Sequence, residues 1–244
     1  MSEATDLVEL LAWDTEWLGL SVARLKVAPY YSAAATTAAI EHCRATGVRL
    51  LYLSLSPTNT AGAAAAVRAG AWLADVKLTF ELSLFPAALA ATHSLPPPNT
   101  VLTKTTAPTL ALEQLVLQSG AYSRFRRDAR IWPLAFAALY KQWLYQCLNH
   151  GTVWVASTKN KPVGLLAFAA RDSYASIELM AVAPAAQGQG IGQELVRAAE
   201  REAQQSGFPK LQVVTQGANQ SAQDLYRRCG FQLAYAAQVY HLWL

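Results

Sequence analysis

The spacing of apolar residues divides the second half of the chain into a regular series of elements. Helical periodicity predicts two helices, short apolar runs then predict three strands, and a glycine-rich segment leads into a further helix. The helices are expected over residues 107–119, 132–149 and 190–205, and the strands over residues 152–157, 162–170 and 176–183. Because strands and helices are interspersed, the pattern favours an α/β protein with a sheet flanked by helices.

An internal repeat links the two halves of the chain. A shift of 160 residues aligns Gly47, Leu51, Leu53, Asn59 and Gly70 with Gly207, Leu211, Val213, Asn219 and Gly230 without a gap. The apolar alternation of residues 80–84 then falls on that of residues 240–244, which keeps apolar side chains on one face of a strand in both copies. Both halves are therefore predicted to end as strand, helix and strand, unless two generic units match by chance.

A proline-rich stretch, residues 93–99, interrupts both periodicities and predicts a linker. With 244 residues and 53% hydrophobic content, the chain can form one large domain or two smaller ones. We expect a first half over residues 1–92 and a second half over residues 100–244. The first half carries no counterpart of the glycine-rich segment at residues 187–192, so it is predicted to act as a scaffold.

The glycine-rich segment, residues 187–192, has the sequence Gln-Gly-Gln-Gly-Ile-Gly and lies between a predicted strand and a predicted helix. Glycines let backbone N–H groups approach an anion, and the helix dipole adds to the attraction. A pyrophosphate cradle is expected, although a glycine turn could simply start the helix. The segment lacks the lysine and hydroxyl of nucleotide hydrolases, and three residues separate it from the strand, unlike the dinucleotide-binding pattern.

The combination of Gln-x-x-Gly-x-Gly after an apolar strand with Asn219 and Tyr226 downstream resembles the GNAT acyl-CoA N-acyltransferases over residues 100–244. The resemblance implies a mixed, largely antiparallel sheet flanked by helices, a degenerate GNAT-like first half, acetyl-CoA as co-substrate and no metal. It implies these cofactor-binding residues: Met180, Ala181, Val182, Gln187, Gly188, Gln189, Gly190, Ile191, Gly192, Asn219 and Tyr226.

The implied reaction is attack of a neutral amine on a thioester, which needs aligned substrates, removal of a proton and stabilisation of the departing thiolate. Tyr226 is the candidate for the thiolate, by proton transfer or hydrogen bonding, and Asn219 could also cap the helix. Glu178 is the candidate general base and is expected to share a strand face with Met180, with ordered water as the alternative. His241 is a weaker candidate for the general base.

A second resemblance, to the dTDP-fucosamine acetyltransferases, rests on residues 13–15, 123–126, 215–226 and 240–243. It implies N-acetylation of a dTDP-4-amino-4,6-dideoxyhexose for surface polysaccharide synthesis. Arg124, Phe125 and Arg126 are the candidate substrate residues, in an expected loop between two helices. Arginines can clamp a diphosphate while an aromatic ring stacks on the base, although a solvated basic loop is the simpler alternative.

Composition narrows the remaining classes. Twenty basic and sixteen acidic residues give a net charge of +4 without a dense basic stripe, so nucleic-acid binding is not expected. No apolar run approaches the roughly 18 residues of a membrane span, which favours a cytoplasmic protein. The three cysteines, Cys43, Cys147 and Cys229, show no metal spacing. Another amine acceptor, a non-catalytic acyl-CoA-binding module, and a monomer or homodimer all stay open.

Overall fold

The computed structural model describes residues 7–26, 30–84 and 100–244. Its strands are β1 (Val8–Leu10), β2 (Val22–Leu25), β3 (Leu50–Leu55), β4 (Trp72–Ser83), β5 (Thr100–Thr105), β6 (Thr152–Thr158), β7 (Lys161–Ala170), β8 (Ala175–Val182), β9 (Lys210–Gln216) and β10 (Gln232–Trp243). Its α-helices are α2 (Ala12–Leu18), α3 (Ala33–Ala45), α4 (Thr60–Arg68), α5 (Leu110–Ser119), α6 (Arg124–Arg127), α7 (Pro133–His150), α8 (Ile191–Gln205) and α9 (Gln220–Arg228).

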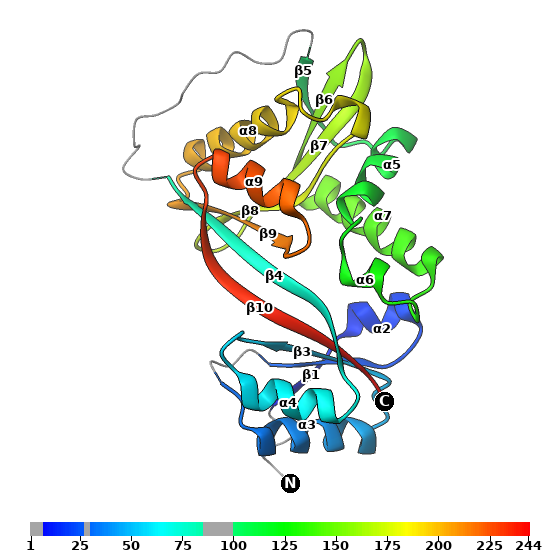
Figure 1. Cartoon of the computed structure of the whole chain (residues 1–244). Coiled ribbons are helices and arrows are strands. Elements are labelled where there is room, and N and C mark those ends of the chain that lie inside the picture. Colours follow the sequence, from blue (N-terminus) through cyan, green and yellow to red (C-terminus); the bar gives the residue numbers. More distant parts are fainter. Residues whose placement is uncertain (1–6, 27–29, 85–99) are drawn as a thin grey trace.

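These strands form one sheet in the order β1-β2-β3-β10-β4-β9-β8-β7-β6-β5 (Figure 1). The pairings β2·β3 and β8·β9 are parallel and the other seven are antiparallel, so the expected mixed, largely antiparallel sheet is confirmed. The predicted helices and strands of the second half all form. Helix α5 begins three residues later than expected because the Thr109 hydroxyl accepts from the Leu112 amide and caps it there.

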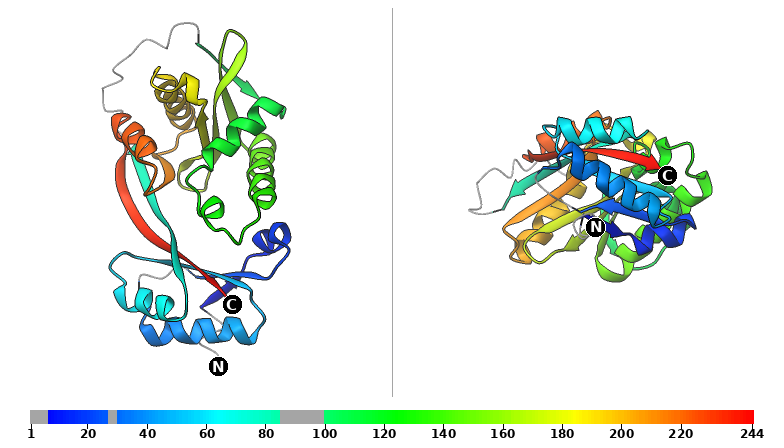
Figure 2. Two further views of the ribbon diagram at one scale, coloured as in Figure 1. Left: turned by 45° about the vertical axis from the view of Figure 1, so that its right-hand side comes forward. Right: turned by 90° about the horizontal axis from the view of Figure 1, so that it is seen from below.

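The last strands of the two halves change places. Strand β4 pairs with β9 of the second half, and β10 pairs with β3 of the first half, while β4 and β10 pair with each other. These two twelve-residue strands run side by side (Figures 1 and 2). They join a lower lobe, which contains β1–β3, α3 and α4, to an upper lobe, which contains β5–β9, α5 and α7–α9 (Figure 1). Each half of the chain therefore completes the sheet of the other.

The strand register follows the 160-residue repeat. Tyr240 pairs with Leu53, and Phe80 pairs with Val213. Tyr240 follows Phe80 by 160 residues in the sequence, and Val213 follows Leu53 by the same number. Lys77 pairs with Ala237, which is its own counterpart in the repeat, and this pair marks the centre of the crossing between β4 and β10. The predicted linker at residues 93–99 lies outside the described residues, so the boundaries of the two halves stay a prediction.

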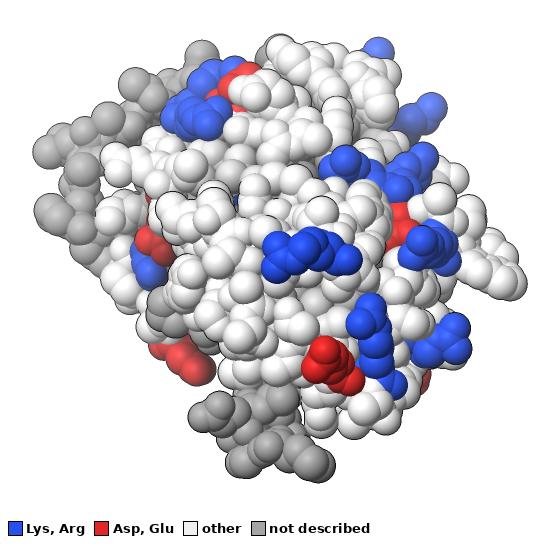
Figure 3. All heavy atoms as spheres, turned by 60° about the horizontal axis from the view of Figure 1, so that its bottom comes forward, with Lys and Arg blue, Asp and Glu red and all other residues white. Residues whose placement is uncertain are grey.

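Three apolar clusters position the candidate site. Helix α8 and residues of α9 pack on one face of β7–β9, and α5 and α7 pack on the opposite face. Helix α3 and residues of α4 cover β2, β3 and the end of β10 in the lower lobe. No described helix is both long enough and apolar enough to cross a membrane. On the face shown in Figure 3, lysine and arginine side chains lie in several separate groups among uncharged surface.

Candidate functional site

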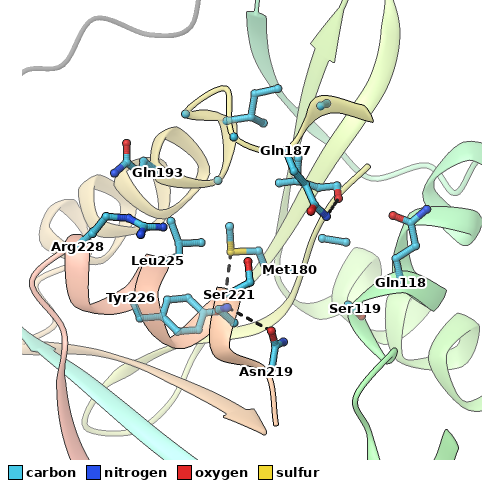
Figure 4. Close-up of a pocket in the computed structure, with 18 of the residues that line it drawn as sticks. Gln118, Ser119, Met180, Gln187, Gln193, Asn219, Ser221, Leu225, Tyr226 and Arg228 are labelled. Carbon is cyan, nitrogen blue, oxygen red and sulfur yellow. Dashed lines mark hydrogen bonds between the residues drawn. The ribbon is translucent and has the colours of Figure 1, made fainter. Parts of the chain in front are cut away.

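The site lies where two parallel strands separate. Strands β8 and β9 pair only from Ala175 to Ile177 on β8, although β8 continues to Val182 and β9 to Gln216. Beyond the last pair, the edge of β8 that faces β9 has no strand partner. A cavity of about 420 Å³ opens there, and it is lined by residues of β8, the glycine-rich segment, α8, α9 and the end of α5 (Figure 4).

The glycine-rich segment has the backbone that its sequence predicts for an anion cradle. Gly188 and Gly190 adopt φ values of 75° and 82°, in the left-handed region where residues with a Cβ are strained. No side chain caps the start of α8, so its first N–H groups keep their hydrogen-bonding capacity. The Gln187 side chain donates to the Val182 carbonyl at 3.0 Å and fixes the segment to β8.

Ten of the eleven expected cofactor-binding residues line the cavity, and only Gln189 does not. Its side-chain amide instead donates back to the Ala185 carbonyl at 3.1 Å, inside the turn. The cavity also holds residues that the sequence patterns did not single out: Gln118, Ser119, Tyr122, Gln193, Ser221 and Arg228. The spacing of seven residues between Ser221 and Arg228 places both on one face of α9, a signal that could have identified them.

Tyr226 lies at the inner end of the cavity and points toward Met180 (Figure 4). Its side chain is 5% exposed, and its hydroxyl lies 3.9 Å from the Met180 sulfur. Burial raises the pKa of Tyr226, so the hydroxyl keeps its proton at neutral pH and can donate a hydrogen bond. Asn219 caps α9, because its side-chain oxygen accepts from the Ala222 amide at 3.2 Å.

A smaller cavity of about 90 Å³ continues from the first toward α7 and the end of β9. Glu178 lines it, but its carboxylate accepts from Arg171 at 2.6 Å. A bulge opposite Ala167 and Phe168 leaves Glu178 without a paired residue on β7. Simple alternation between Glu178 and Met180 is therefore interrupted, although both residues line this cavity.

The expected substrate residues lie outside both cavities. Residues 124–127 form the short helix α6, which corrects the expected loop. Arg124 stacks on the Tyr52 ring at 3.8 Å and donates to His241 Nε2 at 2.8 Å. Phe125 packs between Trp17 and Tyr52, and Arg126 is exposed beside the Phe136 ring.

His241 is part of a buried network and not of the cavity. Its Nδ1 lies 2.6 Å from Asp128 Oδ2, which also accepts from Trp243 Nε1 at 3.0 Å. Burial lowers the pKa of His241 to about 4, so the ring is neutral and donates from Nδ1 while it accepts from Arg124. The network joins α6 of the second half to β10 and the lower lobe.

Comparison with known proteins gives a family match over part of the chain and a fold for most of it. The model of the Acetyltransferase (GNAT) family matches residues 119–231. A functionally unknown protein from Staphylococcus epidermidis ATCC 12228 superposes with a TM-score of 0.65 and 16% identity over 93% of this chain and 87% of that one. A GCN5-related N-acetyltransferase from Sphaerobacter thermophilus gives 0.62 and 13% identity over 97% of this chain and 76% of that one.

A tandem GNAT protein from the clavulanic acid biosynthesis pathway gives a TM-score of 0.58 and 16% identity over 91% of this chain and 75% of that one. No curated protein matches the chain. At these identities the solved structures establish the fold, and the tandem neighbour fits an architecture of two halves. Residues 119–231 are therefore similar to the GNAT acetyltransferases, and the chain as a whole has the GNAT fold.

Proposed function

We propose that the chain is an acetyl-CoA-dependent N-acetyltransferase that uses the separation of β8 and β9 as its active site. The observation that supports the proposal is the opening between these strands, because the glycine-rich segment and Tyr226 line the same cavity there (Figure 4). A volume of about 420 Å³ is within the usual range for a small-molecule site. Acetyl-CoA supplies the activated acetyl group as a thioester.

Each end of the cavity has a distinct task in this proposal. The backbone N–H groups of Gly188 to Gly192 bind the pyrophosphate, with the start of α8 adding the positive end of its dipole. The open edge of β8 from Met180 to Val182 pairs with the pantetheine amides. These contacts hold the thioester beside Tyr226, which converts a bimolecular encounter into an oriented one.

The acceptor nitrogen attacks the thioester carbonyl carbon, the carbon–sulfur bond breaks, and the thiolate leaves. Because its pKa is raised, Tyr226 stabilises the developing thiolate by donating a hydrogen bond. The proton lost by the ammonium group goes to ordered water or to Glu178. The Glu178 carboxylate is already paired with Arg171 at 2.6 Å, so water is the simpler acceptor.

For the acceptor, we propose a nucleotide-activated amino sugar, in particular a dTDP-4-amino-4,6-dideoxyhexose. The support is the sequence resemblance described above; Arg124, Phe125 and Arg126 remain the candidate diphosphate and base contacts. Arg126 is the cleaner residue to test, because Arg124 is also bonded to His241. An Arg126→Ala variant with an unchanged KM for a dTDP-amino sugar would remove Arg126 from the site.

The direct test is mass spectrometry of the protein with acetyl-CoA and dTDP-4-amino-4,6-dideoxyhexoses that are epimeric at C4. One acetyl group gained by one epimer would support both the reaction and the substrate class. Acetyl-CoA binding without product would discard the sugar and direct the search to other amines, the alternative acceptors. Tight binding with no turnover on any amine would indicate a non-catalytic acyl-CoA-binding module.

Gly188→Ala should raise the KM for acetyl-CoA about tenfold, because a Cβ strains a residue with φ of 75° and displaces the N–H groups of the cradle. Gly207→Ala is the matched control, since Gly207 has φ of 77°, equally open surroundings and a position at the far end of α8. Steady-state kinetics and thermal unfolding measure both effects. Equal KM values for the two variants would argue against the cradle.

A further inference from the structure

Strand β4 of the first half lies beside β9, whose end lines the 90 Å³ cavity. Lys77 pairs with Gln216 across β4 and β9, so their side chains are neighbours on one face of the sheet. Gln216 lines the 90 Å³ cavity together with Tyr226 and Tyr140. A ligand whose amine lies at Tyr226 can therefore extend past Gln216 toward Lys77.

Polar atoms without partners gather beyond this point. Among the described residues, four buried side-chain nitrogen or oxygen atoms lack a hydrogen bond: Trp17 Nε1, Tyr52 Oη, Asp75 Oδ1 and Trp154 Nε1. The first three of these residues lie around Arg124 and its neighbour Phe125. Arg124 stacks on Tyr52, and its charge acts on Asp75. Phe125 contacts the Trp17 ring. Buried polar groups in native proteins are nearly always satisfied by protein or water, so these atoms are candidates for contact with a polar ligand. The Tyr52 hydroxyl also interacts with Asp14 and Arg124.

Asp75 is 3% exposed, and the charged groups acting on its carboxylate are Lys77, Arg124 and Arg127. Arg124 is committed to His241 and Tyr52, and Arg127 donates to the Ala74 carbonyl. The Lys77 ammonium has neither a hydrogen bond nor an ion pair within the described part of the chain. The ammonium is therefore available to a ligand, whereas Arg124 would have to exchange a contact to bind one.

The Lys77 side chain is exposed to solvent, but its ammonium group lies near other charged groups. Solvent still reaches its side chain, yet the surrounding protein and the nearby Arg124 charge lower its pKa to about 8. Asp75, Arg24 and Asp14 also act on it. At pH 7 the group is mostly protonated, and it attracts an anion more strongly than a fully hydrated surface lysine does.

We propose that Lys77, Asp75 and Tyr52 of the first half form an acceptor-recognition site for amines that carry a phosphate or carboxylate group. Lys77 binds the anionic group, Asp75 Oδ1 accepts a hydrogen bond from a hydroxyl or N–H of the same molecule, and Tyr52 donates to it. The inference rests on the proposed acetyltransferase function and adds to it the half of the chain that selects the acceptor.

The test compares matched amines that differ in one charged group: phosphoethanolamine with ethanolamine, β-alanine with propylamine, and a dTDP-4-amino-4,6-dideoxyhexose as the larger phosphate-bearing acceptor. In the wild-type protein, kcat/KM for acetylation should favour the anionic member of a pair. Lys77→Met should remove that preference by raising the KM of the anionic amine about tenfold. Lys77→Arg should retain part of it, and the KM for acetyl-CoA should not change.

Lys161→Met is the control, because it removes the same charge from an exposed lysine at the start of β7 that lines neither cavity. Asp75→Ala, which removes the acceptor oxygen, should lower kcat/KM for acceptors with hydroxyl groups. The phosphate and carboxylate pairs show which anion the site takes. A preference that survives Lys77→Met, or one for the neutral amines, would overturn the inference.

A failure of the proposed acetyltransferase activity can be distinguished from a failure of the Lys77 site. If acetyl-CoA binds and no amine is acetylated, calorimetric binding of pyrophosphate to the protein saturated with CoA still tests the site. Binding that weakens tenfold or more in Lys77→Met but not in Lys161→Met would support anion recognition without the acetyltransferase activity. No binding, or binding that is equal in both variants, would reject it.

Discussion

Replacing Tyr226 with phenylalanine is expected to lower kcat for acetyl transfer about 100-fold, the usual loss when one preorganised donor to a developing charge is removed. The KM for acetyl-CoA should hardly change, because the phenyl ring keeps its packing against Phe80 and Phe231. The only hydrogen bond of the hydroxyl within the described structure is the 3.9 Å contact with the Met180 sulfur, so the thermal midpoint should shift little. Steady-state kinetics and thermal unfolding measure both.

Tyr240→Phe is the matched control for this experiment. Tyr240 is also buried, its hydroxyl bonds Gln238 at 3.1 Å, and its counterpart in the repeat, Phe80, is already a phenylalanine. The acetyltransferase activity of the Tyr240→Phe variant should stay at the wild-type level. If Tyr226→Phe and Tyr240→Phe retain the same kcat, the hydroxyl is not the thiolate donor, and the cofactor would have to place its sulfur elsewhere in the cavity.

Much of the upper lobe follows from local sequence. Apolar periodicity predicted β6, β7 and β8, and the glycine-rich segment lies between a strand and a helix as expected, with positive φ values at Gly188 and Gly190. The Asn219 cap was likewise predictable from its position before α9. These features depend on neighbours in sequence, so a single sequence contains the information for them.

The features that depend on distant contacts were not predictable in the same way. The bulge at Glu178 depends on the register with β7, so simple alternation was a wrong guide to its side chain. A basic run near two aromatic residues predicted a substrate loop at residues 123–126, but Tyr52 and His241 lie 72 residues before and 117 residues after Arg124 and bind it. Lys77 gains its role only when β4 pairs with β9.

The exchange of β4 and β10 makes the two halves depend on each other. Strand β10 belongs to the second half by sequence but lies between β3 and β4 of the first. Its end is anchored to the second half by Asp128, which lies next to α6 and receives bonds from both His241 and Trp243. Asp128 therefore connects helix α6 to the strand that completes the lower lobe.

Asp128→Ala is expected to lower the free energy of unfolding by about 3 kcal/mol, because it leaves two buried donors, His241 Nδ1 and Trp243 Nε1, without an acceptor. His241 is 0% exposed, so water cannot replace the lost carboxylate without opening the interface. Denaturant unfolding measures the loss. Asp172→Ala, at an exposed position between β7 and β8, should change the same quantity by less than about 0.5 kcal/mol.

Asp128→Asn separates the hydrogen bonds from the charge. The amide oxygen of asparagine can still accept from His241 or Trp243, and the neutral His241 needs an acceptor and not a counter-ion. Its cost should therefore fall between those of Asp172→Ala and Asp128→Ala. If Asp128→Asn is as damaging as Asp128→Ala, the carboxylate charge itself stabilises the interface, and His241 would have to be protonated in the folded protein. If neither variant is destabilised, the two lobes are held by the β4 and β10 ladder alone, and Asp128 is not an anchor.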